Sequence, residues 1–166
     1  LQGQPESDVK AIALKSLGIV FQSAGGLERS QQYLEQSLEI YRQLGSDTEV
    51  AEALFSLANT LRLMEESDSA QQYYKEAESL LPPSVLKTTS QLNRFSLLLK
   101  TQQWSAARQL LPELVTQVKA LPASRQAAYS RVNLVESLLS HGDETHQPII
   151  WLSVESAADL LRDGMN

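Results

Sequence analysis

The 166-residue sequence contains no cysteine, and only 6% of its residues are aromatic. The lack of cysteine excludes thiol nucleophiles, thiolate zinc sites and disulfides, and it fits a reducing compartment, so we expect a cytoplasmic protein. Apolar runs such as Leu97–Leu99 and Ile149–Leu152 fall far short of the ~20 residues that cross a bilayer. We therefore expect no membrane association.

Signatures of catalysis are also missing. The sequence has no G-x-S-x-G, no glycine-rich phosphate loop and no H-E-x-x-H. The segment His141–His146 contains metal-ligand residue types, but its spacing is not that of a helix face and a solvated loop is the better interpretation. We expect no enzymatic activity, no metal and no cofactor. The formal net charge of -6 disfavours nucleic acid as a partner.

The residues that are present favour helices. Leu, Ala, Gln, Ser and Glu are abundant, and no segment alternates like a strand, which predicts an all-α fold. Two stretches also match at an offset of 40 residues. The matching residues are Ala13 with Ala53, Leu14 with Leu54, Leu17 with Leu57, and Gln31, Gln32 and Tyr33 with Gln71, Gln72 and Tyr73. A helical pair repeated in this way is typical of a solenoid, and solenoids mostly bind proteins.

Glycine and proline divide the chain into repeats at about 8–45, 46–83, 84–122 and 123–164, each an antiparallel helix pair. We expect the first helix at 9–23, capped by Ser7 or Asp8, and a capping box at Ser46–Glu49. The last helix is expected at about 148–162. Residues 1–166 are expected to form a single domain cut from a longer protein.

The repeated stretch resembles the tetratricopeptide repeat (TPR). That family places large, leucine, small and aromatic residues along the first helix, then small, bulky and small residues and a proline along the second. The pattern is followed by Leu54, Leu57, Ala58, Leu61, Ala70, Tyr74, Ala77 and Pro82, and in the first repeat by Leu14, Leu17, Gly18, Phe21, Ser30, Leu34 and Ser37. The resemblance implies a right-handed α-solenoid of about four helix pairs that acts as a protein–protein interaction module.

A period of about 40 residues exceeds the usual 34 or so of this family. The longer type resembles repeats of bacterial multidomain proteins, in which such arrays precede a caspase-like peptidase domain of the CHAT type. Similar arrays occur beside nucleotide-binding or transcriptional regulators and in eukaryotic polarity scaffolds. The bacterial setting is our expectation, and a regulatory or scaffold domain of a CHAT-type enzyme is the alternative function.

The resemblance implies that the first helices of the repeats line a concave groove. The residues expected to face a bound peptide there are Lys15, Phe55, Asn59, Arg62, Asn93, Arg94 and Asn133. Amide side chains can pair with an extended backbone, and the cations favour an acidic or carboxylate-bearing peptide. The competing interpretation is that these are ordinary solvated side chains. Self-association through the solenoid ends is a further possibility, and the sequence does not identify the partner.

Overall fold

A computed structural model describes residues 4–121 and 125–140, and these residues form seven α-helices and no strand. The chain divides into two compact units with the boundary between Pro82 and Pro83, and each unit is described by itself. The all-α prediction is confirmed. The expected helix at 148–162, the segment His141–His146 and Trp151 lie outside the described residues.

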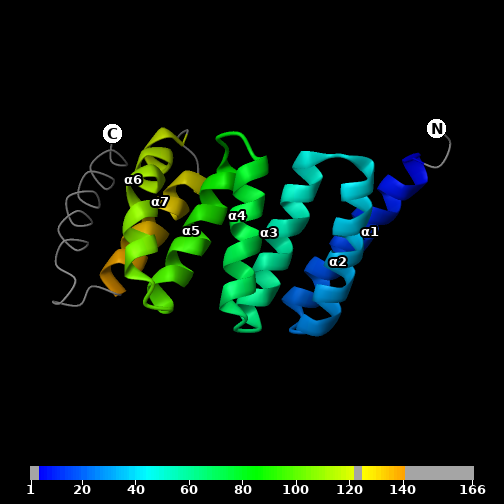
Figure 1. Cartoon of the computed structure of the whole chain (residues 1–166), viewed down its shortest axis with the longest axis horizontal. Coiled ribbons are helices and arrows are strands. Elements are labelled where there is room, and N and C mark those ends of the chain that lie inside the picture. Colours follow the sequence, from blue (N-terminus) through cyan, green and yellow to red (C-terminus); the bar gives the residue numbers. More distant parts are fainter. Residues whose placement is uncertain (1–3, 122–124, 141–166) are drawn as a thin grey trace. The chain divides into compact units, whose positions relative to one another are not determined.

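The first unit contains four helices, α1 (Gln4–Ser23), α2 (Leu27–Leu44), α3 (Asp47–Leu63) and α4 (Ser67–Leu80). Helix α1 packs on α2, α2 on α3 and α3 on α4, and α1 also contacts α3. Consecutive helices run in opposite directions (Figure 1). The unit thus contains two stacked helical hairpins, as the repeat pattern predicts.

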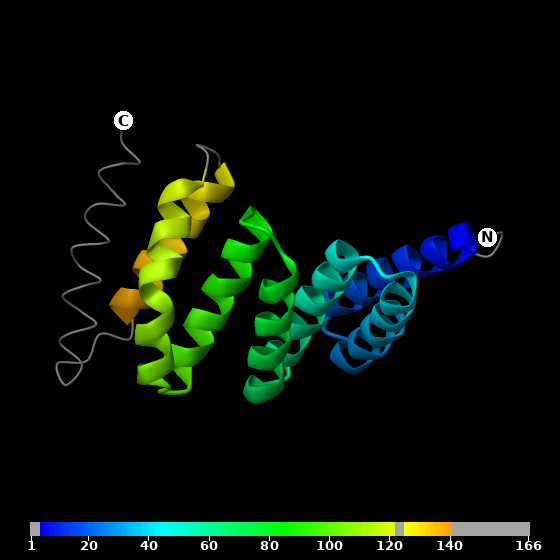
Figure 2. The same ribbon diagram turned by 45° about the horizontal axis from the view of Figure 1, so that its top comes forward.

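The second unit contains α5 (Val85–Lys100), α6 (Trp104–Ala120) and α7 (Arg125–Ser140). Figure 2 shows α5 and α6 as an antiparallel pair, and α7 contacts both helices. Their core is a cluster of aliphatic side chains around Phe95, which is fully buried. Helix α6 continues through Pro112.

One turn recurs between the two helices of successive pairs. Gly25, Glu65 and Gln102 all have positive φ angles, of 81°, 64° and 58°. In each turn the next amide donates to a carbonyl of the preceding helix, for example from Gly26 to the Phe21 carbonyl at 2.8 Å. This bond satisfies a carbonyl that the end of the helix would otherwise leave without a partner. The same chain reversal is therefore built with or without glycine.

One expected helix start and one expected cap are wrong. Helix α1 begins at Gln4 rather than after Ser7 or Asp8, because Pro5 lies in its first turn, where no N–H partner is needed. Helix α3 begins at Asp47 as expected, but Ser46 makes no side-chain cap bond. Its hydroxyl donates to the Glu49 carboxylate instead, so the reciprocal capping box does not form.

Small residues allow the helices of the first unit to lie close together. Ala58, Ala70 and Ala77 are fully buried. A Cβ built on Gly18 would lie 2.6 Å from the Cγ atom of Leu34, so α2 touches the backbone of α1 at this point. The small positions of the repeat pattern are thus close contacts between helices.

Candidate functional site

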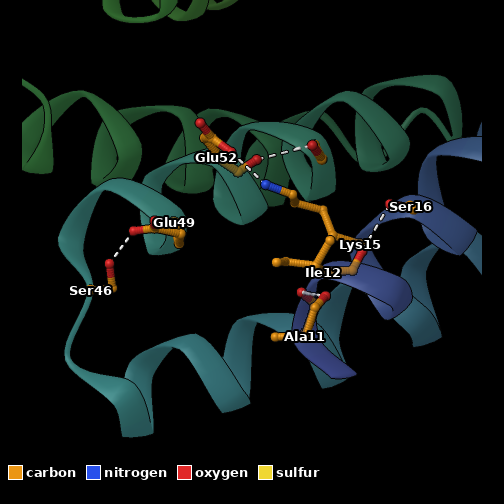
Figure 3. Close-up of polar contacts among 9 residues, drawn as sticks. Ala11, Ile12, Lys15, Ser16, Ser46, Glu49 and Glu52 are labelled. Carbon is orange, nitrogen blue, oxygen red and sulfur yellow. Dashed lines mark hydrogen bonds and ion pairs between the residues drawn. The ribbon is translucent and has the colours of Figure 1, made fainter. Parts of the chain in front are cut away.

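The helices α1 and α3 are the first helices of their pairs, and side chains tie them to each other. The ammonium of Lys15 pairs with the Glu52 carboxylate (Figure 3) and lies 5.6 Å from the centre of the Tyr41 ring. Only 17% of the Lys15 side chain is exposed, against 44% for Glu52. Lys15, predicted as a groove cation, is therefore already paired with a carboxylate from the neighbouring helix.

A second tie joins the other ends of the same two helices. The Gln22 amide donates to the Thr60 hydroxyl at 2.7 Å and to the Ser56 carbonyl at 3.3 Å. The Thr60 hydroxyl also bonds to the Ser30 hydroxyl at 2.9 Å, where both residues are fully buried. This network connects three helices, so the faces of α1 and α3 are held in register.

The Tyr41 ring lies beneath the Lys15 ammonium and is fully buried. Burial raises the pKa of the Tyr41 hydroxyl, and the negative charges of Asp8, Glu49 and Glu52 raise it further. The hydroxyl is buried and has no hydrogen-bond partner among the described residues. The pKa of Glu49 is lowered, mainly by the hydrogen bond from Ser46. Tyr41 therefore remains neutral, and Glu49 remains charged, over the ordinary pH range.

A hydrogen bond from the neighbouring helix α4 orients the Asn59 side chain. The buried Tyr74 hydroxyl of α4 donates to the Asn59 side-chain carbonyl at 2.5 Å. The Phe55 ring lies 6.1 Å from the Tyr74 ring, tilted by 58°. Phe55 and Asn59 are half-buried, and Arg62 is exposed in the last turn of α3. Because these three residues are spaced i, i+4 and i+7, they lie on one face of α3.

The other predicted groove residues belong to the second unit. Asn93 and Arg94 are half-buried on α5, and Asn133 is exposed on α7. The two helices are linked by the hydroxyls of Ser96 and Ser137, which are 2.6 Å apart. The structure thus places four predicted residues on α1 and α3 of one unit, and three on α5 and α7 of the other.

Sequence reasoning missed the residues that hold the predicted ones. The repeat pattern accounts for Tyr74 only as a bulky residue, and its hydroxyl also orients Asn59. Glu52 neutralises Lys15 from the next repeat, and a signal for this existed in the sequence. Phe55 is the repeat equivalent of Lys15, and Glu52 lies one helical turn before Phe55 on α3. Lys15 and Glu52 therefore place opposite charges at neighbouring positions of adjacent first helices.

The described part of the chain shows neither a membrane-spanning helix nor a metal-binding cluster. None of its helices combines the length and the apolar character needed to cross a membrane. Within residues 4–121 and 125–140 there is also no group of three or more histidine, aspartate or glutamate residues arranged to hold a metal ion. The predicted residues of α1 and α3 instead lie beside side chains of both charges, such as Glu52 and Arg62.

Comparison with known proteins identifies the repeats. Residues 8–82 match the family model for the tetratricopeptide repeat. No curated protein gives a match to this sequence. Among solved structures, the chain is similar to the nearly identical TPR-like repeats of a Podosopora anserina protein assigned as a kinesin light chain. The identity is 16% and the TM-score 0.68, covering 91% of this chain and 74% of the other.

A single-substitution variant of the same Podosopora anserina protein gives a TM-score of 0.67 at 16% identity, covering 92% of this chain and 76% of the other. Tetratricopeptide repeats generally mediate protein–protein interactions, and the fold is typically a non-catalytic module. The family match includes both helical hairpins of the first unit, and the structural likeness extends over most of the chain. Residues 8–82 therefore belong to the tetratricopeptide repeat family, and the chain shares the fold of TPR-like repeat proteins.

Proposed function

We propose that this chain is a non-enzymatic interaction module that binds a peptide or protein segment along its first helices. In the first unit the binding surface would be formed by α1 and α3, with Lys15, Phe55, Asn59 and Arg62. In the second unit it would include Asn93, Arg94 and Asn133. We call the set on α1 and α3 the inner surface.

The face of α3 carries this proposal. Phe55 offers an apolar contact, Asn59 an amide oriented by Tyr74, and Arg62 an exposed guanidinium, one helical turn apart. An extended peptide needs hydrogen-bonding groups for its backbone and pockets for its side chains. An amide that is already oriented loses little conformational entropy on binding. The arrangement suits a short peptide better than a small molecule.

The charge of the inner surface favours an acidic peptide only moderately. Glu52 neutralises Lys15, which leaves Arg62 as the exposed predicted cation of the first unit. A carboxylate of the ligand would pair with Arg62 directly, and with Lys15 only in competition with Glu52. We therefore expect modest affinity and a moderate dependence on salt.

The test is a selection of displayed short peptides for binding to the purified protein. One random library is rich in Asp and Glu, and the other is rich in Lys and Arg. Binding of the selected peptides is then measured for wild type and for Arg62→Ala. Arg108→Ala is the matched control, because it removes an exposed guanidinium from a second-type helix. We expect acidic peptides to be enriched and Arg62→Ala alone to weaken them. Equal affinity for all three proteins would contradict the proposal.

The finer setting of the module is a separate proposal. The resemblance predicts that the parent protein is bacterial and cytoplasmic. It also predicts that the repeats regulate a CHAT-type peptidase domain in the same protein. The parent reading frame downstream of Asn166 tests it. A His/Cys dyad in a caspase-like domain would support the regulatory role, and an unrelated domain would remove it.

A further inference from the structure

One face of α1 is apolar and exposed. Val9 is 66% exposed and Val20 is 62%, with Ile12 at 48% and Leu17 at 43% between them. The exposed Ala13 and Ser16 lie at the centre of this stripe. From residue 12 onward the only charged side chain of α1 is Lys15, which is paired with Glu52. A solvent-facing helix normally carries charge, so this stripe has the character of an interface.

The repeat itself shows what kind of contact this face makes. The residues 40 positions after Ala13, Leu17 and Val20 are Ala53, Leu57 and Thr60, and all three are buried in α3. Helix α2 packs on α3, and Ser30 of α2 bonds to Thr60 at 2.9 Å. One side of the stripe on α1, formed by Ala13, Leu17 and Val20, is thus the equivalent of a face that receives another helix one repeat later. The other stripe residues correspond to the half-buried Glu49, Glu52 and Ser56.

The same comparison argues against a second-type helix such as α2 as the occupant. The equivalent of Thr60 on α1 is Val20, which has no hydroxyl to bond to a serine like Ser30. A buried serine without a partner costs free energy, so the stripe favours a partner that brings no unpaired hydroxyl. The stripe on another copy of α1 is such a partner, because its one hydroxyl, that of Ser16, already donates to the Ile12 carbonyl at 2.9 Å.

The stripe is also complementary to itself. Its members, at positions 9, 12, 13, 16, 17 and 20, are symmetric in spacing and in size, with large residues outside and small ones at the centre. Two such helices in antiparallel order bring Val9 against Val20 of the second copy, Ile12 against Leu17, and Ala13 against Ser16. A two-fold interface requires this reciprocity, and small central residues allow the helices to cross closely.

We propose that two copies of this chain associate through an antiparallel, two-fold pair of α1 helices. None of the inner-surface residues belongs to the stripe, so the association uses other side chains than the proposed peptide binding. One helix pair buries less than the roughly 1,200–2,000 Å² of a standard interface. The dimer is therefore weak and forms as the concentration rises.

Sedimentation over a range of protein concentrations tests the association. The weight-average mass should rise from 18.4 kDa toward twice that value. Ala13→Arg places two cations at the crossing point and should weaken the dimer more than about tenfold. Gln36→Arg adds the same charge at an exposed position of α2 and should leave association unchanged. A wild type that stays at the monomer mass would overturn the proposal.

Crosslinking tests the register, because the chain has no cysteine of its own. A mixture of Val9→Cys and Val20→Cys proteins should form a disulfide-linked dimer faster than either protein alone. Equal rates for all pairings would overturn the antiparallel register.

A synthetic peptide of residues 27–44 tests whether the stripe binds a second-type helix instead. If it binds a monomeric wild type, and Ala13→Arg abolishes that binding, the face takes a second-type helix and the dimer proposal is wrong.

Discussion

Replacing Gly18 with alanine tests the closest contact between helices of the first unit. Two opposing effects decide the result. Alanine stabilises a helix interior by about 1 kcal/mol relative to glycine. The new methyl group would lie 2.6 Å from Cγ and 2.8 Å from Cδ2 of Leu34, and 3.3 Å from the Ser30 carbonyl oxygen. Both distances to Leu34 are shorter than side chains tolerate.

The steric term should win. Leu34 is fully buried, and its nearest atom is the branch point of the side chain, so no terminal methyl can simply swing away. Overpacking of this kind costs about 1–3 kcal/mol. Set against the gain in helix propensity of about 1 kcal/mol, we expect Gly18→Ala to lower the free energy of unfolding by up to about 2 kcal/mol.

Urea denaturation followed by far-UV circular dichroism measures this change. Both tryptophans, Trp104 and Trp151, follow Pro83, so their fluorescence reports separately on the second unit. Leu34→Ala should cost about 2–5 kcal/mol alone. In the double variant Gly18→Ala with Leu34→Ala the clash is gone. Its loss of stability should therefore be smaller than the sum of the losses in the two single variants. A stabilising Gly18→Ala, or strictly additive losses, would refute the packing argument.

Two further changes probe the polar groups of the same unit. Thr60→Val removes a hydroxyl that bonds to Ser30 and Gln22, so it should cost about 1–3 kcal/mol in urea denaturation. Adding Ser30→Ala should recover part of that loss, and no recovery would contradict the network. Tyr41→Phe keeps the ring over Lys15 and removes a buried hydroxyl without a partner among the described residues, so stability at neutral pH should hold or rise. The folded-state pKa of Tyr41 is raised above 10.0, so its contribution to stability is present below that pH and is lost as the pH rises through the folded-state value. Thermal denaturation at alkaline pH should show this loss in wild type and a smaller one in Tyr41→Phe, and equal losses would contradict the assignment.

The repeat could be predicted from the sequence because its signals are local. Gly45 ends α2 with a left-handed φ of 70°, and α4 ends at Leu80, just before Pro82 and Pro83. The small residues of the pattern, such as Ala58 and Ala77, are buried as their spacing implies. Each of these features depends on only a few neighbouring residues, so the fold class and the helix pairing follow from the pattern.

The contacts of the inner surface could be predicted only in part. The periodicity places Lys15 and Asn59 on the first helices, which the structure confirms. It does not say that Glu52 pairs with Lys15, or that Tyr74 reaches Asn59 from another helix. Those contacts depend on the offset and rotation between packed helices, which side-chain sizes at the close contacts decide. The start of α1 at Gln4 was missed for a simpler reason, because polar residues before a helix look like a lead-in.

The most direct test of the proposed function changes the charge next to Lys15. Glu52→Gln keeps the shape of the side chain and releases the lysine from its carboxylate partner. Titration calorimetry with an acidic peptide selected on wild type would then compare the two proteins. If the inner surface binds the peptide, Glu52→Gln should raise the affinity by about three- to tenfold, and the gain should disappear in Glu52→Gln with Lys15→Met. An unchanged or weaker affinity for Glu52→Gln would contradict binding at this surface.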